Sequence, residues 1–198
     1  MNHLLQLPAL SNRYFAMRHG RSLANLEGII VSDPGVGIDG YGLSDPGRAH
    51  VESTLHEDKQ LDSSFRILCS DFRRARETAE IAHRLLQCET SIEFDQRLRE
   101  RWFGDIDLGP DSAYADVWQA DASNPDSEHL GAESVNRVLA RTTSLVRDLE
   151  TRFQQSNILL VSHGDALQIL QTAFAGQSAS QHRNLPHLET AEIRCFKR

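Results

Sequence analysis

The stretch YFAMRHG (residues 14–20) is a short apolar run that ends in an Arg-His-Gly triplet. A second apolar run, ILLV (158–161), is followed closely by another His-Gly pair, His163-Gly164. Short apolar runs with such boundaries are typical of buried strands. In an open α/β sheet, ligands bind beyond the carboxyl ends of the strands. Although 144 positions separate them, His19 and His163 are therefore predicted to meet in one pocket.

Strand-like and helix-like segments alternate along the chain. The expected strands are 14–17, 65–69, 91–94, 157–161 and 191–196, and the expected helices are 44–59, 72–87, 135–153 and 165–175. The helix at 135–153 repeats apolar residues at helical spacing. Such alternation predicts a three-layer α/β/α fold, with a mostly parallel, mixed central sheet covered on both faces by helices.

The 198 residues are expected to form a single domain spanning 1–198, because no repeat, low-complexity tract or linker interrupts them. Two segments rich in Gly, Pro, Asp, Asn and Ser, at 33–47 and 108–131, are predicted to be long irregular connections. Connections of that length are commonly functional, so we expect them to form walls of the pocket.

Composition narrows the class of protein. Hydrophobic residues at 39% and charged residues at 25% are typical of a soluble globular protein. No apolar stretch approaches the roughly 20 residues that a membrane-spanning helix needs, and the first residues lack the pattern of a secretory signal, so a cytoplasmic location and no membrane partner are expected. The net charge of −7 argues against a nucleic-acid partner. Three cysteines without CxxC pairing indicate neither a disulfide framework nor a metal site.

The residues at the strand ends indicate chemistry on phosphate. Imidazole can act as a nucleophile or acid/base near neutral pH, and a neighbouring guanidinium such as that of Arg18 binds phosphate oxygens with a planar fork. The expected strand 65–69 leads into SDFRRARETA (70–79), a helix that Ser70 or Asp71 could cap and whose first turn carries arginines. A helix start with arginines is a natural phosphate cradle. LRERWFG (98–104) then brings a carboxylic acid, Glu100, to the same region.

Other polar and aromatic residues are expected to be peripheral. On their helix, Arg73 and Arg76 point away from the face of Arg74 and should be solvated. Trp102, Trp118 and Tyr114 are expected either at the pocket mouth or in the core. The remaining histidines lack ligand spacing and are expected at the surface: His3, His50, His56, His83, His129, His182 and His187.

Taken together, these segments resemble the histidine phosphatase superfamily, also called the phosphoglycerate-mutase-like clan, and more closely its small cytoplasmic branch. The resemblance covers most of the chain, and it rests on the joint order of motifs that are individually weak. The motifs are RHG (18–20) with Ser22 and Asn25, GLSDPG (42–47), SDFRRARETA (70–79), ERWFG (100–104), GAES (131–134) and VSHG (161–164).

The resemblance implies a catalytic scheme. His19 would accept the phosphoryl group on a ring nitrogen, and water would then hydrolyse the phosphohistidine. Arg18, Arg74 and His163 would surround the phosphoryl oxygens, so that neither a metal nor a cofactor is needed. Glu100 would protonate the leaving oxygen and later deprotonate water. Arginines alone would lower the pKa of that carboxyl, so this role requires burial or the charge of the substrate to oppose them.

Candidate substrate contacts follow from the same motifs. Ser22 and Asn25 lie three apart at an expected helix start, and the backbone N–H of Gly164 is a further donor. Two positions depart from the family pattern. Arg21 stands where many relatives carry Glu, and it either adds a basic group or faces solvent. Phe103 stands where mutases of the clan usually have Tyr, which removes a hydroxyl.

The predicted function is hydrolysis of phosphomonoesters. The chain is shorter than typical mutases of the clan, and together with Phe103 this favours a phosphatase. A phosphoglycerate mutase is the alternative within the clan, and a catalytically weak module that binds phosphorylated ligands is the alternative outside it. The sequence leaves the oligomeric state open, and it leaves open a sugar phosphate, phosphoglycerate, a nucleotide-related ester, a ribazole phosphate of the cobalamin pathway and a phosphoprotein as substrates.

Overall fold

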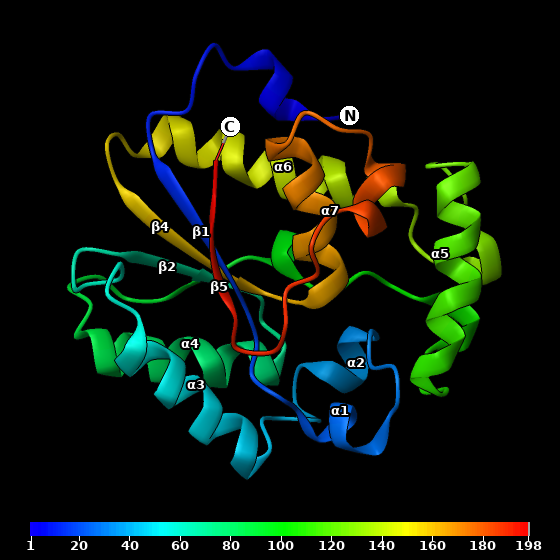
Figure 1. Ribbon diagram of the computed structural model, residues 1–198, viewed down its shortest axis with the longest axis horizontal. Coiled ribbons are helices and arrows are strands. Elements are labelled where there is room, and N and C mark those ends of the chain that lie inside the picture. The colour runs from blue at the N-terminus through cyan, green and yellow to red at the C-terminus, as the bar shows by residue number, and fades with distance from the viewer. Residues whose placement is uncertain (198) are drawn as a thin grey trace.

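One five-stranded sheet forms the centre of the computed structural model, which describes residues 1–197 (Figure 1). Its strands lie in the order β3-β2-β4-β1-β5. β1, β2, β3 and β4 are parallel to their neighbours, whereas β5 runs antiparallel to β1, which confirms the predicted mixed sheet. The strands are β1 (Arg13–Arg18), β2 (Arg66–Cys69), β3 (Glu93–Phe94), β4 (Asn157–Ser162) and β5 (Ile193–Phe196).

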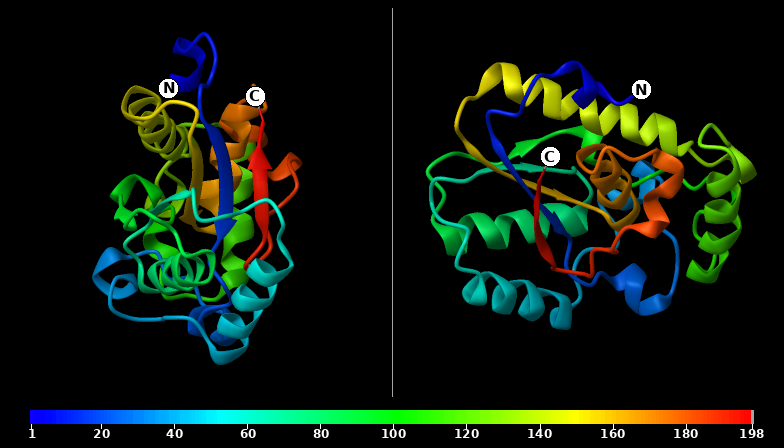
Figure 2. Two further views of the ribbon diagram at one scale, coloured as in Figure 1. Left: turned by 90° about the vertical axis from the view of Figure 1, so that its left-hand side faces the viewer. Right: turned by 45° about the horizontal axis from the view of Figure 1, so that its top comes forward.

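Helices cover both faces of the sheet (Figure 2). Tyr14 and Ala16 on β1 pack into one core with α6 (Val135–Arg152) and α7 (Gly164–Phe174). The intervening Phe15 and Met17 pack into a second core with α3 (Asp45–Glu57) and α4 (Arg73–Leu86). Because both faces of a strand are buried, its sequence is a continuous apolar run. The predicted three-layer arrangement is thus confirmed.

Three shorter helices lie at the carboxyl-terminal edge of the sheet (Figure 1). They are α1 (Leu23–Glu27), α2 (Pro34–Gly37) and α5 (Tyr114–Ser123). Short 3-10 segments lie between these elements: η1 (His3–Gln6), η2 (Gln96–Leu98), η3 (Gly104–Ile106), η4 (Asp111–Ala113), η5 (His129–Gly131) and η6 (Ala179–Asn184).

The two segments predicted to be irregular contain helices, so that part of the prediction is wrong. Within 108–131 lies the ten-residue α5. Its buried residues are Val117 and the polar Asp121, so it shows no apolar stripe in the sequence. Within 33–47 lies the single turn α2, which has Pro34 in its first turn and is capped by the side chain of Asp33, which accepts the N–H of Gly35 at 2.8 Å.

The predicted cap of α4 is also wrong. The residue at the cap position is Phe72, and no side chain caps the helix. Ser70 instead lies before the helix, where its Oγ accepts the N–H of Phe72 at 3.3 Å and lies 2.8 Å from Nε2 of His163. A contact with a distant strand end therefore replaces the local cap.

Candidate active site

Strand register brings the two histidines together. Arg18 on β1 is paired with Ser162 on β4, and the N–H of His19 donates to the Ser162 carbonyl at 3.0 Å. His163 is the next residue along, so the two rings meet with centroids 5.2 Å apart. Both side chains are buried. The end of β2 joins them, since the Ser70 N–H donates to the carbonyl of Val161 at 3.0 Å.

The contacts of His19 define its tautomer. Nδ1 lies 2.8 Å from the Gly20 carbonyl, which can only accept, so Nδ1 carries the hydrogen. Nε2 therefore has a lone pair, and Nε of Arg74 donates to it at 3.0 Å. Burial, followed by the charges of Arg74 and Arg18, lowers the pKa of His19 well below its ordinary value. His19 is thus a neutral imidazole whose Nε2 can act as a nucleophile.

His163 is positioned by its neighbours in the same way. Its Nε2 lies 2.8 Å from Oγ of Ser70, and its ring meets that of Phe72 edge to face at 5.1 Å. Burial, followed by the charge of Arg74, lowers the pKa of His163 well below its ordinary value. Because Ser70 accepts the N–H of Phe72, its own hydrogen is available for Nε2. When Ser70 donates to Nε2, Nδ1 carries the ring hydrogen and is a donor.

The two arginines are held by backbone carbonyls. Nη1 of Arg18 donates to the backbone carbonyl of Leu188 at 2.9 Å and lies 2.7 Å from Nε2 of His187. Nη2 of Arg74 donates to the carbonyl of Val31 at 2.9 Å. Rigid contacts of this kind fix where the remaining guanidinium N–H groups point.

Three buried nitrogens of this cluster have no hydrogen-bond partner within residues 1–197: Nε of Arg18, Nη1 of Arg74 and Nδ1 of His163. Buried polar groups in native proteins are nearly always paired. Three unpaired donors in one cluster, two of them on guanidinium groups, indicate a site for an anionic ligand that accepts hydrogen bonds.

Glu100 is held at the start of α7. Its Oε1 accepts the backbone N–H of Arg101 at 2.9 Å and that of Ala166 at 3.3 Å. Burial, followed by the charge of Asp165, raises the pKa of Glu100, and the charges of Arg74 and Arg18 oppose this. Burial therefore outweighs the arginines, and the carboxyl is suited to donate a proton.

A cavity of about 100 Å³ adjoins this cluster, and Arg18 and Glu100 are the two predicted catalytic residues that line it. Its lining residues are Arg18, Glu100, Phe103, Tyr114, Trp118, Gly164, Asp165 and His187. Tyr114 stacks on Trp118 with centroids 5.1 Å apart and meets the ring of Phe103 at 4.6 Å. Tyr114 and Trp118 thus line the pocket, as one of the two sequence interpretations expected. Trp102 lies elsewhere, in a separate hollow of about 250 Å³ that also contacts Glu100.

A larger hollow, of about 630 Å³, lies at residues 8–13 and 195–197. None of the predicted catalytic residues lines it. Its size therefore does not make it the candidate site, because it lacks the converging polar groups that orient a ligand.

The predicted substrate-binding residues have different surroundings. Ser22 and Asn25 bond to each other in a capping box that starts α1. Arg21 is exposed, and Phe103 is buried in the cavity wall. A Cβ on Gly164 would lie 3.2 Å from Cζ of Arg18, so glycine allows the guanidinium to approach the start of α7 closely.

Arg73 and Arg76 point away from the buried Arg74, as expected: the Arg73 side chain is 47% exposed and Arg76 is partly buried. Arg73 donates to Glu77 at 2.9 Å and to the carbonyl of Asp39 at 3.2 Å. Arg76 donates to the carbonyl of Ile38 at 2.9 Å. Both side chains therefore hold the loop that follows α2, rather than the phosphate site.

Sequence reasoning missed several neighbours of the site. His182 was expected at the surface but is fully buried, and His187 was expected there but contacts Arg18. Ser70 was considered only as a helix cap. Its place directly after β2, at the same sheet edge as the histidines, is a signal that could have identified it. Nothing local in the sequence distinguishes His182 and His187 from surface histidines.

Two features are absent from residues 1–197. No helix there is long and apolar enough to cross a membrane. No three His, Cys, Asp or Glu side chains there are grouped so that they could hold a metal ion. Cys69, Cys88 and Cys195 are free thiols, the first two buried and the third partly buried.

Comparison with known proteins gives consistent matches. The sequence pattern of the histidine phosphatase superfamily (branch 1) matches residues 14–198. The chain is 26% identical over 175 residues to the adenosylcobalamin/alpha-ribazole phosphatase of Escherichia coli K12, covering 84% of this chain and 81% of that protein. It is 32% identical over 124 residues to the "Probable phosphoglycerate mutase GpmB" of Salmonella paratyphi A, covering 60% and 57%. The fold is similar to that of a mycobacterial glucosyl-3-phosphoglycerate phosphatase solved with VO3, with a TM-score of 0.77, 23% identity and coverage of 94% and 92%.

Proposed function

The chain belongs to the histidine phosphatase superfamily, as its motifs predicted, and we propose that it hydrolyses phosphomonoesters through a phosphohistidine on His19. One observation carries the proposal. Three buried donors that have no hydrogen-bond partner among residues 1–197, on Arg18, Arg74 and His163, belong to the cluster that holds the neutral His19. A phosphoryl group would satisfy these donors, and its phosphorus could face Nε2.

The first step of the proposed reaction transfers the phosphoryl group to the enzyme. Nε2 of His19 attacks phosphorus, and the bond from phosphorus to the leaving oxygen breaks as Glu100 gives that oxygen its proton. The N–H of Arg74 that bonds Nε2 in the free enzyme turns to a phosphoryl oxygen. Arg18, Arg74 and His163 then stabilise the charge of the transition state.

The second step returns the enzyme to its starting state. Glu100, now a carboxylate, takes a proton from water, and the resulting hydroxide attacks phosphorus. The bond between Nε2 and phosphorus breaks, phosphate leaves, and His19 is again neutral with its hydrogen on Nδ1. Glu100 is again protonated for the next substrate.

We assign the substrate-binding roles unequally. The backbone N–H of Gly164 and the ring of Phe103 adjoin the cavity and would contact substrate. Ser22 and Asn25 would act mainly by starting α1, because their hydrogen-bonding groups serve the capping box. The exposed Arg21 would meet only a substrate that extends out of the cavity.

The phosphatase reading has more support than the mutase alternative. The relative from Escherichia coli that is named a phosphatase matches over 81% of its length, whereas the relative named a mutase matches over 57%. Phe103 also lacks the hydroxyl typical of the mutases. A cytoplasmic location, the absence of a nucleic-acid partner and independence from metal ions stay predictions from the sequence.

The decisive experiment measures phosphate release by the purified protein from p-nitrophenyl phosphate and a panel of alkyl phosphates. We expect His19→Ala to lower kcat/KM by about 10³-fold or more, since the covalent route is lost. The exposed His129 offers a matched control, and His129→Gln should retain wild-type activity. Activity should persist in EDTA, because guanidinium groups supply the positive charge.

Three results would overturn the proposal. Equal phosphate release by wild type and His19→Ala, with both proteins folded as judged by circular dichroism, would exclude a phosphohistidine intermediate on His19. Dependence on a bisphosphate primer, with isomerisation faster than hydrolysis, would establish the mutase instead. Binding of inorganic phosphate without turnover would leave only a binding module.

A further inference from the structure

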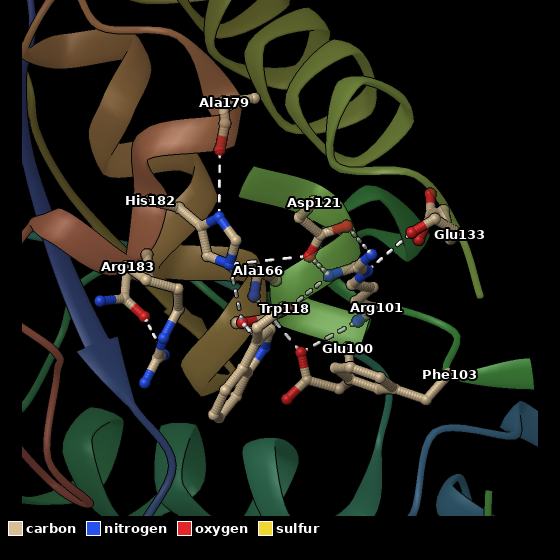
Figure 3. A network of polar contacts seen from close by, with 12 residues as sticks. Glu100, Arg101, Phe103, Trp118, Asp121, Glu133, Ala166, Ala179, His182 and Arg183 are labelled. Atoms are coloured by element: carbon tan, nitrogen blue, oxygen red, sulfur yellow. Dashed lines mark hydrogen bonds and ion pairs between the residues drawn. The ribbon is translucent and has the colours of Figure 1, made fainter. Parts of the chain in front are cut away.

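A buried ionic network lies next to Glu100, and the reaction steps above do not use it (Figure 3). At its centre is Arg101, whose side chain is 0% exposed. Its Nη1 and Nη2 donate to the two carboxylate oxygens of Asp121 at 2.6 and 2.8 Å. Nη1 also donates to Oδ2 of Asp165 at 3.2 Å, and Nε donates to the carbonyl of Glu133 at 2.6 Å.

Asp165 connects this network to the cavity. It lies on α7 between Gly164 and Ala166, the residue whose N–H holds Glu100, and it lines the same cavity as Glu100. Its Oδ1 accepts the indole N–H of Trp118 on α5 at 3.1 Å. One carboxylate therefore contacts the residue that follows Glu100 and the helix that forms the cavity wall.

The charges of the network do not cancel. Two carboxylates, on Asp121 and Asp165, face one guanidinium. Nε2 of His182 lies 3.7 Å from Asp165 and 4.0 Å from Asp121. Burial lowers the pKa of His182, and the two carboxylates oppose this. While His182 is neutral, the network carries a net negative charge beside Glu100.

Stability alone does not account for such a network. Replacing buried ion pairs with apolar side chains of similar volume is often neutral or stabilising, because taking charges out of water is costly. The network is also placed where it can act on Glu100. Both backbone N–H groups that hold the Glu100 carboxyl come from residues of this region, Arg101 and Ala166.

We propose that Asp165 is a positioning residue for Glu100: through Arg101 and its place on α7 it anchors the two backbone N–H groups that hold the carboxyl, and it places a negative charge in the cavity beside that carboxyl. The inference rests on the proposed phosphatase function. Asp165 acts through Glu100 and not on the phosphoryl group, because its two oxygens are already engaged by Arg101 and Trp118.

The groups that face Glu100 have opposing effects. Asp165 comes from α7, Arg18 from β1, Arg74 from α4 and Tyr114 from α5. Arg99, Glu133 and Arg141 line the second hollow that contacts Glu100. Burial and then the charge of Asp165 raise the pKa of Glu100, while Arg74 and Arg18 lower it. Without the charge of Asp165, the effect of the arginines on the pKa of Glu100 is less opposed, so the pKa falls and Glu100 loses its proton at a lower pH.

The test compares Asp165→Asn with Asp121→Asn. Both variants remove one buried carboxylate from the same guanidinium, but Asp121 does not line the cavity with Glu100. For an alkyl phosphate, whose leaving group needs a proton, we expect the alkaline limb of kcat/KM to move to lower pH in Asp165→Asn, by about half a pH unit or more. The alkaline limb should stay in place in Asp121→Asn.

With p-nitrophenyl phosphate, whose leaving group needs no proton, Asp165→Asn should lose little activity at any pH.

A second measurement does not depend on turnover. In protein labelled with carbon-13 at the glutamate carboxyls, Glu100→Gln identifies the signal of Glu100, and the signal is titrated in wild type and in Asp165→Asn. We expect a lower midpoint in Asp165→Asn. Should Asp165→Asn fail to fold, Asp165→Ser, which also lacks the charge, takes its place.

The outcomes separate this inference from the proposed function. An unmoved carbon-13 midpoint, or equal losses in both Asn variants at every pH, would make Asp165 merely structural. A protein that shows the shifted midpoint but no His19-dependent phosphate release would retain the electrostatic inference and lose the proposed function.

Discussion

At the scale of single residues, His163 is held on one side and open on the other. Ser70 fixes Nε2 at 2.8 Å, and Nδ1 is buried without a partner in residues 1–197. The hydroxyl therefore sets both the ring orientation and the nitrogen that carries the hydrogen. In the proposed reaction, that hydrogen points to a phosphoryl oxygen.

We predict that Ser70→Ala lowers kcat/KM by about 10-fold or more, because the imidazole loses its fixed tautomer and orientation. The free energy of unfolding should fall by about 1–3 kcal/mol, because Nε2 is left buried and unpaired. Steady-state kinetics and urea denaturation measure the two effects. Ser53→Ala, at an exposed position on α3, is the matched control and should behave as wild type. Wild-type kinetics in Ser70→Ala would contradict the assignment.

At the scale of elements, the single turn α2 supports the start of α4. Gly37 at the end of α2 packs against Phe72, and a Cβ there would lie 2.4 Å from Cε2 of that ring. Phe72 in turn contacts the ring of His163, and the guanidinium of Arg74 lies 5.0 Å from its centroid. A helix of four residues can thus influence the position of two groups of the site.

We predict that Gly37→Ala destabilises the protein by about 1–3 kcal/mol, because the added methyl group must displace a buried ring in a packed core. It should also lower kcat/KM, since Phe72 cannot move without disturbing His163. Gly35→Ala lies in the same turn but is exposed, and its methyl group would meet only the side chain of Asp33. That control should leave both urea denaturation and kinetics nearly unchanged. Equal behaviour of the two variants would show that α2 does not support the site.

At the scale of the whole molecule, the parallel sheet places two imidazoles in a buried centre. Burial is the first cause that lowers the pKa of both His19 and His163 below the ordinary value of 6.5. Below pH 6.5 the unfolded chain takes up protons at these positions while the folded chain does not. Their contribution to stability is therefore complete above pH 6.5 and is lost as the pH falls toward their folded-state pKa values.

We predict that the free energy of unfolding falls between pH 6.5 and pH 5, by up to about 1.4 kcal/mol per pH unit for each such histidine. Urea denaturation at several pH values measures the slope. His163→Asn should make the slope shallower, whereas His129→Asn, at an exposed position, should leave it unchanged. A slope that His163→Asn does not change would show that its imidazole is protonated in the folded protein. The range stays above pH 5 because buried carboxylates such as Asp165, whose pKa is lowered in the fold, titrate at lower pH.

Local pattern in the sequence was enough for most of the architecture. Apolar runs such as 158–161 and the periodicity of 135–153 determined the strands, the helices and their order, because a side chain's burial follows the repeat of its element. The meeting of His19 with His163 followed from their places at strand ends, and β1 and β4 are indeed neighbours. The sequence did not predict the polar helix α5, because the buried side of this helix includes Asp121 and therefore shows no apolar repeat.

What only the tertiary structure decided is the state of each group in the site. The sequence placed Glu100 among arginines but could not tell which way its pKa moves, and burial together with Asp165 raises it. It likewise could not reveal which nitrogen of His163 the Ser70 hydroxyl contacts or that His187 contacts Arg18. Desolvation and contacts between distant segments depend on which atoms surround a group in space, and neither is encoded in the neighbours of a residue along the chain.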